Sequence, residues 1–298
     1  MSNRKRRLKK RDPNKPPQFR GSDFTMRWEQ GRWAEEVVMK AINSTRQFRA
    51  IPYGRSQISA ETDPQTKAEY WRNYVEIEKN WKRPDFLVLR KSALARNRRA
   101  WRGLLRRPTV SSDQQLSNVL KHSVCGLECE NSLWKTKRMP DADTTLPLSK
   151  LNIIAPRIWV KEEDTEGLSR WSRRFHRPIV VVQVFFDRAY AVTYKKLISR
   201  VRRINKLRSE KKRNALQKQL GVILVRWGYG DSRTGRETTK LVYTCHHTVG
   251  VRFGDFIESP GRKPRVITDK NGKMMPYVRF VGGRMRLTAD ALKLLRTI

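Results

Sequence analysis

The chain has 298 residues, of which 66 are Lys or Arg and 28 are Asp or Glu, so its formal net charge is +38. Such an excess repels itself unless a polyanion neutralises it, which makes DNA or RNA the expected partner and an anionic membrane the main alternative. No apolar run approaches the roughly 18 residues of a spanning helix, and no signal-peptide pattern is visible. The three cysteines, an odd number, argue against a disulfide framework and for a reducing, cytoplasmic setting.

The first twenty residues differ in composition from the rest of the chain. Residues 1–20 carry a nearly unbroken Lys/Arg run followed by three prolines, a pattern that predicts a disordered basic tail. An arm that embraces DNA and a localisation or solubility tail are both compatible with it. Residues 21–298 are expected to form one domain, with a core over about 25–220 and a β-rich extension over about 221–298.

The pattern of apolar residues predicts the first elements of that core. Helical spacing predicts a helix from residue 31 to about 43 and another over 64–81. Extended segments follow at 86–89 and 123–130, separated by a basic insertion over 90–120 that is expected to be irregular. The elements thus begin with helices followed by strands, as expected of a mixed sheet with helices packed on it.

The second half continues this alternation. A short helix opens at residue 162, a strand at 179–186 is apolar on both faces and therefore central in the sheet, and a long basic helix is expected over 193–220. The expected elements after it are strands at 222–227, 240–245, 249–253, 266–268 and 277–281 and a helix over 288–295. The fold class is therefore α/β, with a mixed sheet flanked by helices and a strand-rich C-terminal extension.

The basic insertion between the two extended segments is a candidate DNA contact. Arginines surround an aromatic residue there, and this combination can both clamp phosphate and stack on a base. The alternative is a solvated loop or a short helix. The candidate DNA-binding residues are Arg99, Trp101, Arg102, Arg106 and Arg107.

Three carboxylates have the spacing of a cation site. Asp85 stands at the head of one extended segment, and Glu128 and Glu130 are two residues apart on another, so the last two point to the same face. If the strands are neighbours, the three acids converge on one ion. Mg²⁺ accepts such hard oxygen ligands and activates water for attack on a phosphodiester. The chain is therefore expected to hold Mg²⁺ and to cut nucleic acid.

Several further side chains are candidates for supporting roles. Glu35 or Glu36, on the helix that precedes the sheet, could supply another metal ligand. Lys135 or Lys137 follows the glutamates and could stabilise the leaving charge or orient the water. Gln183, inside an apolar strand, is a weaker candidate, and a satisfied core amide is the simpler interpretation.

At this point the motifs resemble a known nuclease core. Arg83-Pro84-Asp85 before an apolar strand, followed by Leu127-Glu128-Cys129-Glu130, resembles the PD-(D/E)XK superfamily, and the helix containing Glu35 resembles its leading helix. The resemblance implies that Asp85 and Glu128 are metal ligands. Glu130 stands at the superfamily's lysine position, a departure that leaves the lysine's role open to Lys135.

A narrower resemblance spans four stretches: residues 71–88, 127–140, 160–164 and 181–190 are similar to the AccI-type type II restriction endonucleases. The family implies Mg²⁺-dependent cleavage of double-stranded DNA at a short palindrome by a homodimer, in the bacterial cytoplasm, with a DNA methyltransferase as system partner and no membrane. Two functions of other kinds remain open. One is a non-catalytic basic nucleic-acid-binding protein, and the other is a structure-selective nuclease of repair or mobile-element origin.

Overall fold

The computed structural model describes residues 22–54, 81–132, 134–142, 148–150, 155–231, 236–268 and 274–298. The basic tail expected over 1–20 lies outside these residues, as does the helix expected over 64–81 except for its last residue. Among the described helices, none is both long and apolar enough to cross a membrane.

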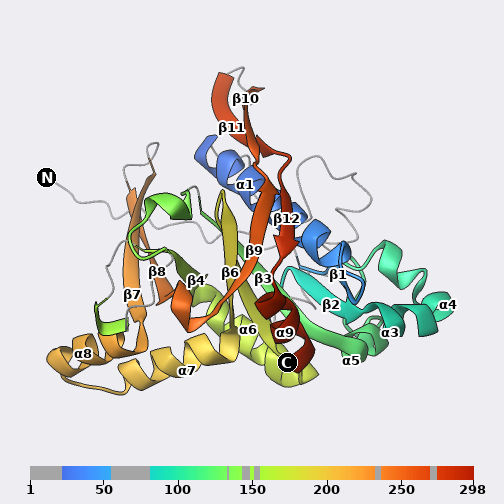
Figure 1. Cartoon of the computed structure of the whole chain (residues 1–298), viewed down its shortest axis with the longest axis horizontal. Coiled ribbons are helices and arrows are strands. Elements are labelled where there is room, and N and C mark those ends of the chain that lie inside the picture. The colour runs from blue at the N-terminus through green and yellow to red at the C-terminus, as the bar shows by residue number, and fades with distance from the viewer. Residues whose placement is uncertain are drawn as a thin grey trace, which may run out of the picture.

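A seven-stranded mixed sheet forms the centre of the molecule (Figure 1). Its strands, in spatial order, are β1 (Phe48–Pro52), β2 (Phe86–Arg90), β3 (Ser123–Asn131), β5 (Ile179–Val184), β6 (Arg188–Thr193), β9 (Val251–Glu258) and β12 (Arg284–Leu287). The β3–β5 pair is parallel and the other five pairs are antiparallel. The central strand β5 is buried at every residue, as its continuous apolar run predicts. The expected mixed α/β fold is confirmed.

Each face of this sheet has its own apolar core, because side chains alternate along every strand. Val180, Val182 and Val184 of β5 join the core under α1 (Ser22–Asn43) and α9 (Ala289–Thr297). Ile179 and Val181 join the opposite core, under α5 (Ser117–His122), α6 (Glu162–Phe175) and α7 (Tyr194–Asn205). Helices therefore cover the sheet from both sides (Figure 1).

The remaining strands form two smaller units. The short strand β4 (Arg157–Lys161) pairs with β8 (Arg236–His246), which pairs in turn with β7 (Val222–Asp231). The pair β10 (Gly261–Thr268) and β11 (Met274–Val281) projects as a ribbon beyond the end of α1 (Figure 1). Single-turn 3₁₀ helices lie in the connections, at η3 (Thr136–Arg138), η4 (Leu148–Lys150) and η5 (His247–Val249). The strands after residue 220 thus contribute to all three sheets.

Two regions differ from what the sequence pattern predicts. The expected helix over 193–220 is two helices, because α7 ends at Asn205 and α8 (Glu210–Leu220) begins after Ser209, whose hydroxyl accepts a hydrogen bond from Lys212 N–H. Gly221 ends α8 in the left-handed conformation, with φ at 63°, which glycine adopts without strain. The basic insertion, expected to be irregular, is mostly helical: its elements are α3 (Lys91–Arg96), α4 (Arg98–Trp101), η2 (Leu104–Arg106) and α5.

Candidate active site

The two strands that carry the predicted acids are neighbours. Phe86 of β2 lies opposite Leu127 of β3, so the residue before β2 meets the glutamate end of β3. Asp85 Oδ2 accepts a 2.7 Å hydrogen bond from the backbone N–H of Cys129, the residue between the two glutamates. Asp85, Glu128 and Glu130 are all less than a tenth exposed.

The tightest acidic cluster includes a residue that sequence reasoning missed. Carboxylate oxygens of Glu128, Glu130 and Asp164 all lie within 4.8 Å of one another. The two glutamates lie on β3, and Asp164 comes from the first turn of α6. The sequence signal for Asp164 is the acidic run that opens this helix, but acids at a helix N-terminus are favourable for the helix alone and so do not indicate a site.

Two lysines reach the acids, and neither is the predicted one. The Lys82 ammonium group donates to Glu128 and lies 2.9 Å from Asp164 Oδ2. The Lys161 ammonium group, at the end of β4, lies 3.5 Å from Glu130 Oε1. Lys135 is exposed next to η3, and among the described residues no hydrogen bond or ion pair joins it to the acids.

Four carboxylates therefore share two ammonium groups in this buried cluster. Burial is the largest cause that raises the pKa of Asp85 to about 8, Glu35 raises it further, and Lys82 lowers it. Burial likewise raises the pKa of Glu128 and of Glu130, while Lys82 opposes both effects. Burial disfavours the charged form of Lys82, but the neighbouring carboxylates, Glu128 first, outweigh burial and raise its pKa. When all four acids are ionised, their negative charge exceeds the positive charge of the two lysines.

Unsatisfied polar atoms lie in the same place. Within the described part of the chain, Glu128 Oε2 is buried without a hydrogen-bond partner, and both amide atoms of Gln183 are in the same state. Gln183 lies beside Glu130 in the parallel register of β3 and β5. The expected satisfied core amide is therefore wrong for Gln183. A divalent cation with its waters fits this donor set, because it supplies the missing charge and accepts hard oxygen ligands.

Glu35 approaches the cluster from the other face of the sheet. It lies on α1 and is 4% exposed. Of the charged groups that act on Asp85, Glu35 raises its pKa the most. Asp85 thus lies between Glu35 on one side and the cluster of Glu128, Glu130 and Asp164 on the other.

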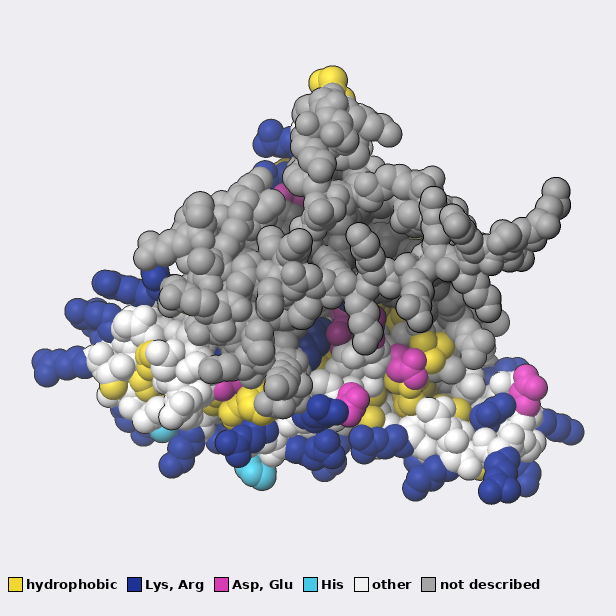
Figure 2. Space-filling view, turned by 180° about the vertical axis from the view of Figure 1, so that it is seen from behind, with side chains coloured by type: hydrophobic (Ala, Val, Ile, Leu, Met, Phe, Trp, Pro, Cys, Tyr) yellow, Lys and Arg dark blue, Asp and Glu magenta, His cyan; other side chains and the backbone are white. Residues whose placement is uncertain are grey.

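The predicted DNA-contact residues fall into two classes. Arg99, Arg102, Arg106 and Arg107 are exposed on the insertion, and Figure 2 shows Lys and Arg side chains gathered along the lower part of the visible face. Trp101 is 1% exposed and packs in the core, with its ring centroid 5.4 Å from that of His122. Base stacking by Trp101 does not fit this conformation. Its apolar ring anchors the basic insertion to the core instead.

Comparison with known proteins agrees with this arrangement. Residues 6–145 match the family model described as AccI restriction endonuclease, a range that contains Asp85, Glu128 and Glu130. No curated protein and no solved structure shows a significant match to the chain. Over this range, just under half of the chain, the protein is similar to the AccI-type restriction endonucleases, which are DNA-cleaving hydrolases.

Proposed function

We propose that the chain is a type II site-specific deoxyribonuclease that hydrolyses phosphodiester bonds of double-stranded DNA with Mg²⁺. The observation that carries this proposal is the buried cluster in which Asp85, Glu128, Glu130 and Asp164 share the charges of Lys82 and Lys161. A deficit of positive charge inside a protein with a formal net charge of +38 is costly unless a cation offsets it. The similarity to the AccI family supports DNA cleavage as the reaction.

The acids divide into ligands and supports in this proposal. Asp85, Glu128 and Asp164 would hold the cation, and the negative charge of Glu35 would add to the field that attracts it. The bound Mg²⁺ would neutralise charge on the phosphate and make water a better nucleophile. The hydrogen bond from the Cys129 N–H fixes one oxygen of Asp85 and leaves the other for the cation.

The remaining polar groups would accept the proton of the attacking water and stabilise the charge on the phosphate. Burial raises the pKa of the Glu130 carboxyl group, so its carboxylate is a stronger base than an exposed glutamate and can accept that proton. Lys161, beside Glu130, and Lys82, beside Glu128, would stabilise negative charge as it develops on the phosphate. These two lysines would fill the role that the resemblance leaves open at position 130.

The proposal extends to the assembly. A short palindromic site has two-fold symmetry, which a homodimer with two-fold symmetry matches. We further propose that a cognate DNA methyltransferase protects the same site without forming a stable complex, and that both proteins act in the bacterial cytoplasm. Arg99, Arg102, Arg106 and Arg107 would contact the phosphate backbone of the bound duplex.

Incubation of the purified chain with plasmid and Mg²⁺ tests the proposal. Discrete fragments that disappear with EDTA, and whose ends share one sequence, are the expected result. Glu128→Gln should abolish cutting while DNA binding persists. Glu166→Gln, an exposed acid of α6 paired with Arg170, is the matched control and should cut normally.

Two other outcomes separate the alternatives. Uncut plasmid under varied metal and salt, with unchanged DNA affinity in Glu128→Gln, would indicate a non-catalytic binder. Cleavage of forks or junctions but not of linear duplex would indicate a structure-selective nuclease.

A further inference from the structure

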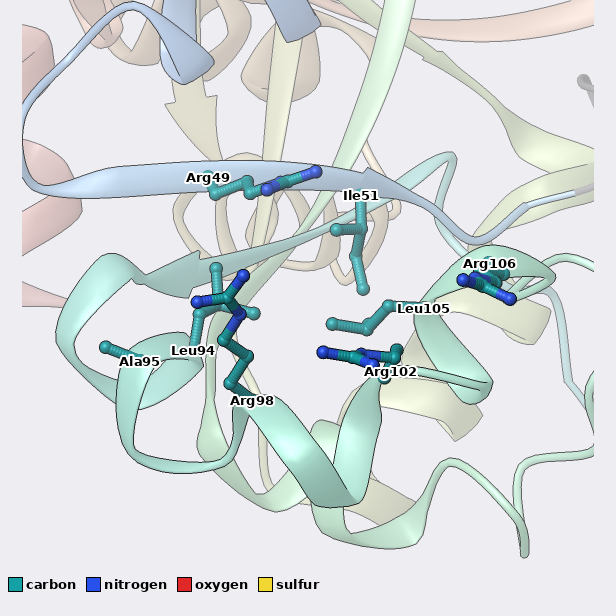
Figure 3. Close-up of a pocket in the computed structure, with 8 residues that line it drawn as sticks. All are labelled: Arg49, Ile51, Leu94, Ala95, Arg98, Arg102, Leu105 and Arg106. Atoms are coloured by element: carbon teal, nitrogen blue, oxygen red, sulfur yellow. The ribbon is translucent and has the colours of Figure 1, made fainter.

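A second candidate site lies beside the edge strand β1, in the basic insertion. The structure has a cavity of about 390 Å³ there (Figure 3). Its walls are Arg49, Ile51, Leu94, Ala95, Arg98, Arg102, Leu105 and Arg106. We call it the arginine pocket. Its volume is within the range of about 300–1,000 Å³ that is typical of small-molecule sites.

The arginine pocket has an apolar interior and a cationic rim. Ile51 is 4% exposed, and Leu94 and Leu105 pack against the same core cluster. In Figure 3, Arg49 lies on one side of the cavity and Arg98 and Arg102 on the other, with the apolar side chains between them. Because β1 and the insertion are distant in sequence, only the folded chain assembles this combination.

The four arginines of the pocket have no counter-charge among the described residues. No carboxylate or carbonyl of that part of the chain is paired with the guanidinium groups of Arg49, Arg98, Arg102 or Arg106. By contrast, the buried Arg83 guanidinium is 2.7 Å from Asp113 and donates to Ser111 O. Four such cations around one cavity repel each other, and an anion bound there would relieve this repulsion.

The pocket is separate from the acidic cluster. It is walled by β1 and by the helical insertion, whereas the acids lie on β3 and α6. The buried network of Arg83, Asp113 and Tyr53, in which the Tyr53 hydroxyl donates to Asp113 at 2.6 Å, belongs to neither. None of the residues that line the pocket is acidic, so the pocket does not favour a metal ion.

We propose that the arginine pocket binds one nucleotide unit, with its phosphate held by the arginines and its base and sugar against the apolar wall. Guanidinium groups match phosphate geometry with paired hydrogen bonds and also stack on planar rings. A bare phosphate would leave the apolar wall uncovered. The nucleotide is either part of a DNA strand or free in solution. Only the first source rests on the proposed nuclease function.

The first experiment measures nucleotide binding without DNA. The probes are a deoxynucleoside monophosphate, inorganic phosphate and the unphosphorylated deoxynucleoside, titrated against the full chain by calorimetry and by thermal unfolding. The monophosphate should bind at least about tenfold more tightly than either fragment, because only it uses both parts of the pocket. Equal binding of the monophosphate and inorganic phosphate would overturn the proposal.

Two double variants with equal charge loss localise the effect. Arg49→Ala/Arg98→Ala removes two pocket residues, one from β1 and one from the insertion. Arg46→Ala/Arg96→Ala removes two exposed arginines that do not line the pocket, one just before β1 and one from the insertion. The pocket variant should bind the nucleotide at least about tenfold more weakly, whereas the control variant should bind it as the unaltered protein does. Both variants should have the thermal unfolding curve of the unaltered protein. The same loss in both would overturn the proposal.

The second experiment distinguishes the two sources of the nucleotide. Duplex binding is measured in a Glu128→Gln background, so the result does not depend on cutting. If the pocket holds a DNA nucleotide, the monophosphate competes with duplex for binding. The slope of log K against log salt concentration is then also shallower in the pocket variant than in the control variant, by about 0.9 for each phosphate that the arginines no longer neutralise. If duplex binding is equal in both double variants while nucleotide binding differs, the ligand is a free nucleotide.

Discussion

The carboxylate of Asp85 accepts a hydrogen bond from the backbone N–H of Cys129 at 2.7 Å. This single bond connects the start of β2 to the part of β3 that carries Glu128 and Glu130 on either side of Cys129. It fixes the orientation of Asp85 without neutralising it, because a backbone amide brings no full charge. The acids of both strands are therefore held together before any cation binds, which reduces the ordering required when it does.

Asp164→Asn should reduce cleavage at least about 100-fold, comparable to the loss of one preorganised group that stabilises a transition state. The asparagine keeps the shape of the side chain but removes a charge from the cluster that Asp164 forms with Glu128 and Glu130. Plasmid cleavage rates over a range of Mg²⁺ concentrations measure the effect.

The control for this variant is Glu163→Gln, the exposed neighbour of Asp164 in the same turn of α6. It removes the same charge from the same helix end, so any effect on helix stability is shared. Equal activity of the two variants would show that Asp164 is a helix-capping acid rather than a ligand.

The contribution of Asp85 to stability without metal should fall as pH rises from about 4 to about 8, whereas that of His246, whose pKa is lowered to about 3, should rise up to about pH 6.5. The folded-state pKa of Asp85 is about 8, against an ordinary value near 4, so the folded protein binds more protons than the unfolded chain across this window. The Asp85 contribution to the unfolding free energy therefore decreases with pH there, since stability rises with pH only where the unfolded state binds more protons. Thermal unfolding in EDTA between pH 4 and pH 9 measures this slope.

Magnesium should reverse the trend, because the cation takes the place of the proton. Its affinity should increase with pH and level off near the pKa of Asp85. In Asp85→Asn the slope in EDTA should become shallower. An identical slope in that variant would show that Asp85 ionises normally in the folded protein.

Gln183→Leu should separate stability from activity. Both amide atoms of Gln183 are buried without partners in the described structure, so an apolar side chain of similar size should leave stability unchanged or raise it. Cleavage should fall if the amide orients a ligand or a water beside Glu130. A stability loss with normal cleavage would refute this role.

Gly126→Ala should destabilise the protein by about 1–3 kcal/mol, as overpacking of a tight core does. A Cβ at this position of β3 would lie 2.5 Å from Pro84 Cγ and 2.9 Å from Trp171 Cη2. Relief of the clash would displace Pro84 and with it Asp85, so cleavage should fall as well. Gly103→Ala is the matched control, because nothing lies within 4 Å of a Cβ there. Denaturant unfolding compares the two variants.

The sequence predicted those parts of the site that depend on local geometry. Glu128 and Glu130 share a face because their spacing is two residues on a strand, and the central position of β5 follows from its apolar run. Both inferences need only the strand itself. The sheet class likewise follows from the order of the elements.

Other parts of the site depend on packing that spacing does not reveal. Asp164 and Lys161 reach the glutamates only because β4 leaves the main sheet and places the start of α6 over the end of β3. The burial of Trp101 was not predicted because its arginine neighbours indicate a surface, whereas the helices of the insertion turn its ring inward. The many arginines of such a segment indicate that one face is exposed, but they do not reveal which residues its other face buries.

The crossover between the parallel strands β3 and β5 also affects the order in which the proposed centre can form. This connection carries Lys161 and Asp164, so the first half of the chain contains Asp85, Lys82 and both glutamates but lacks these two partners. The last two strands of the main sheet, β9 and β12, are made later still. A nascent chain on the ribosome, or a fragment that ends before β4, would therefore contain the proposed centre only in part.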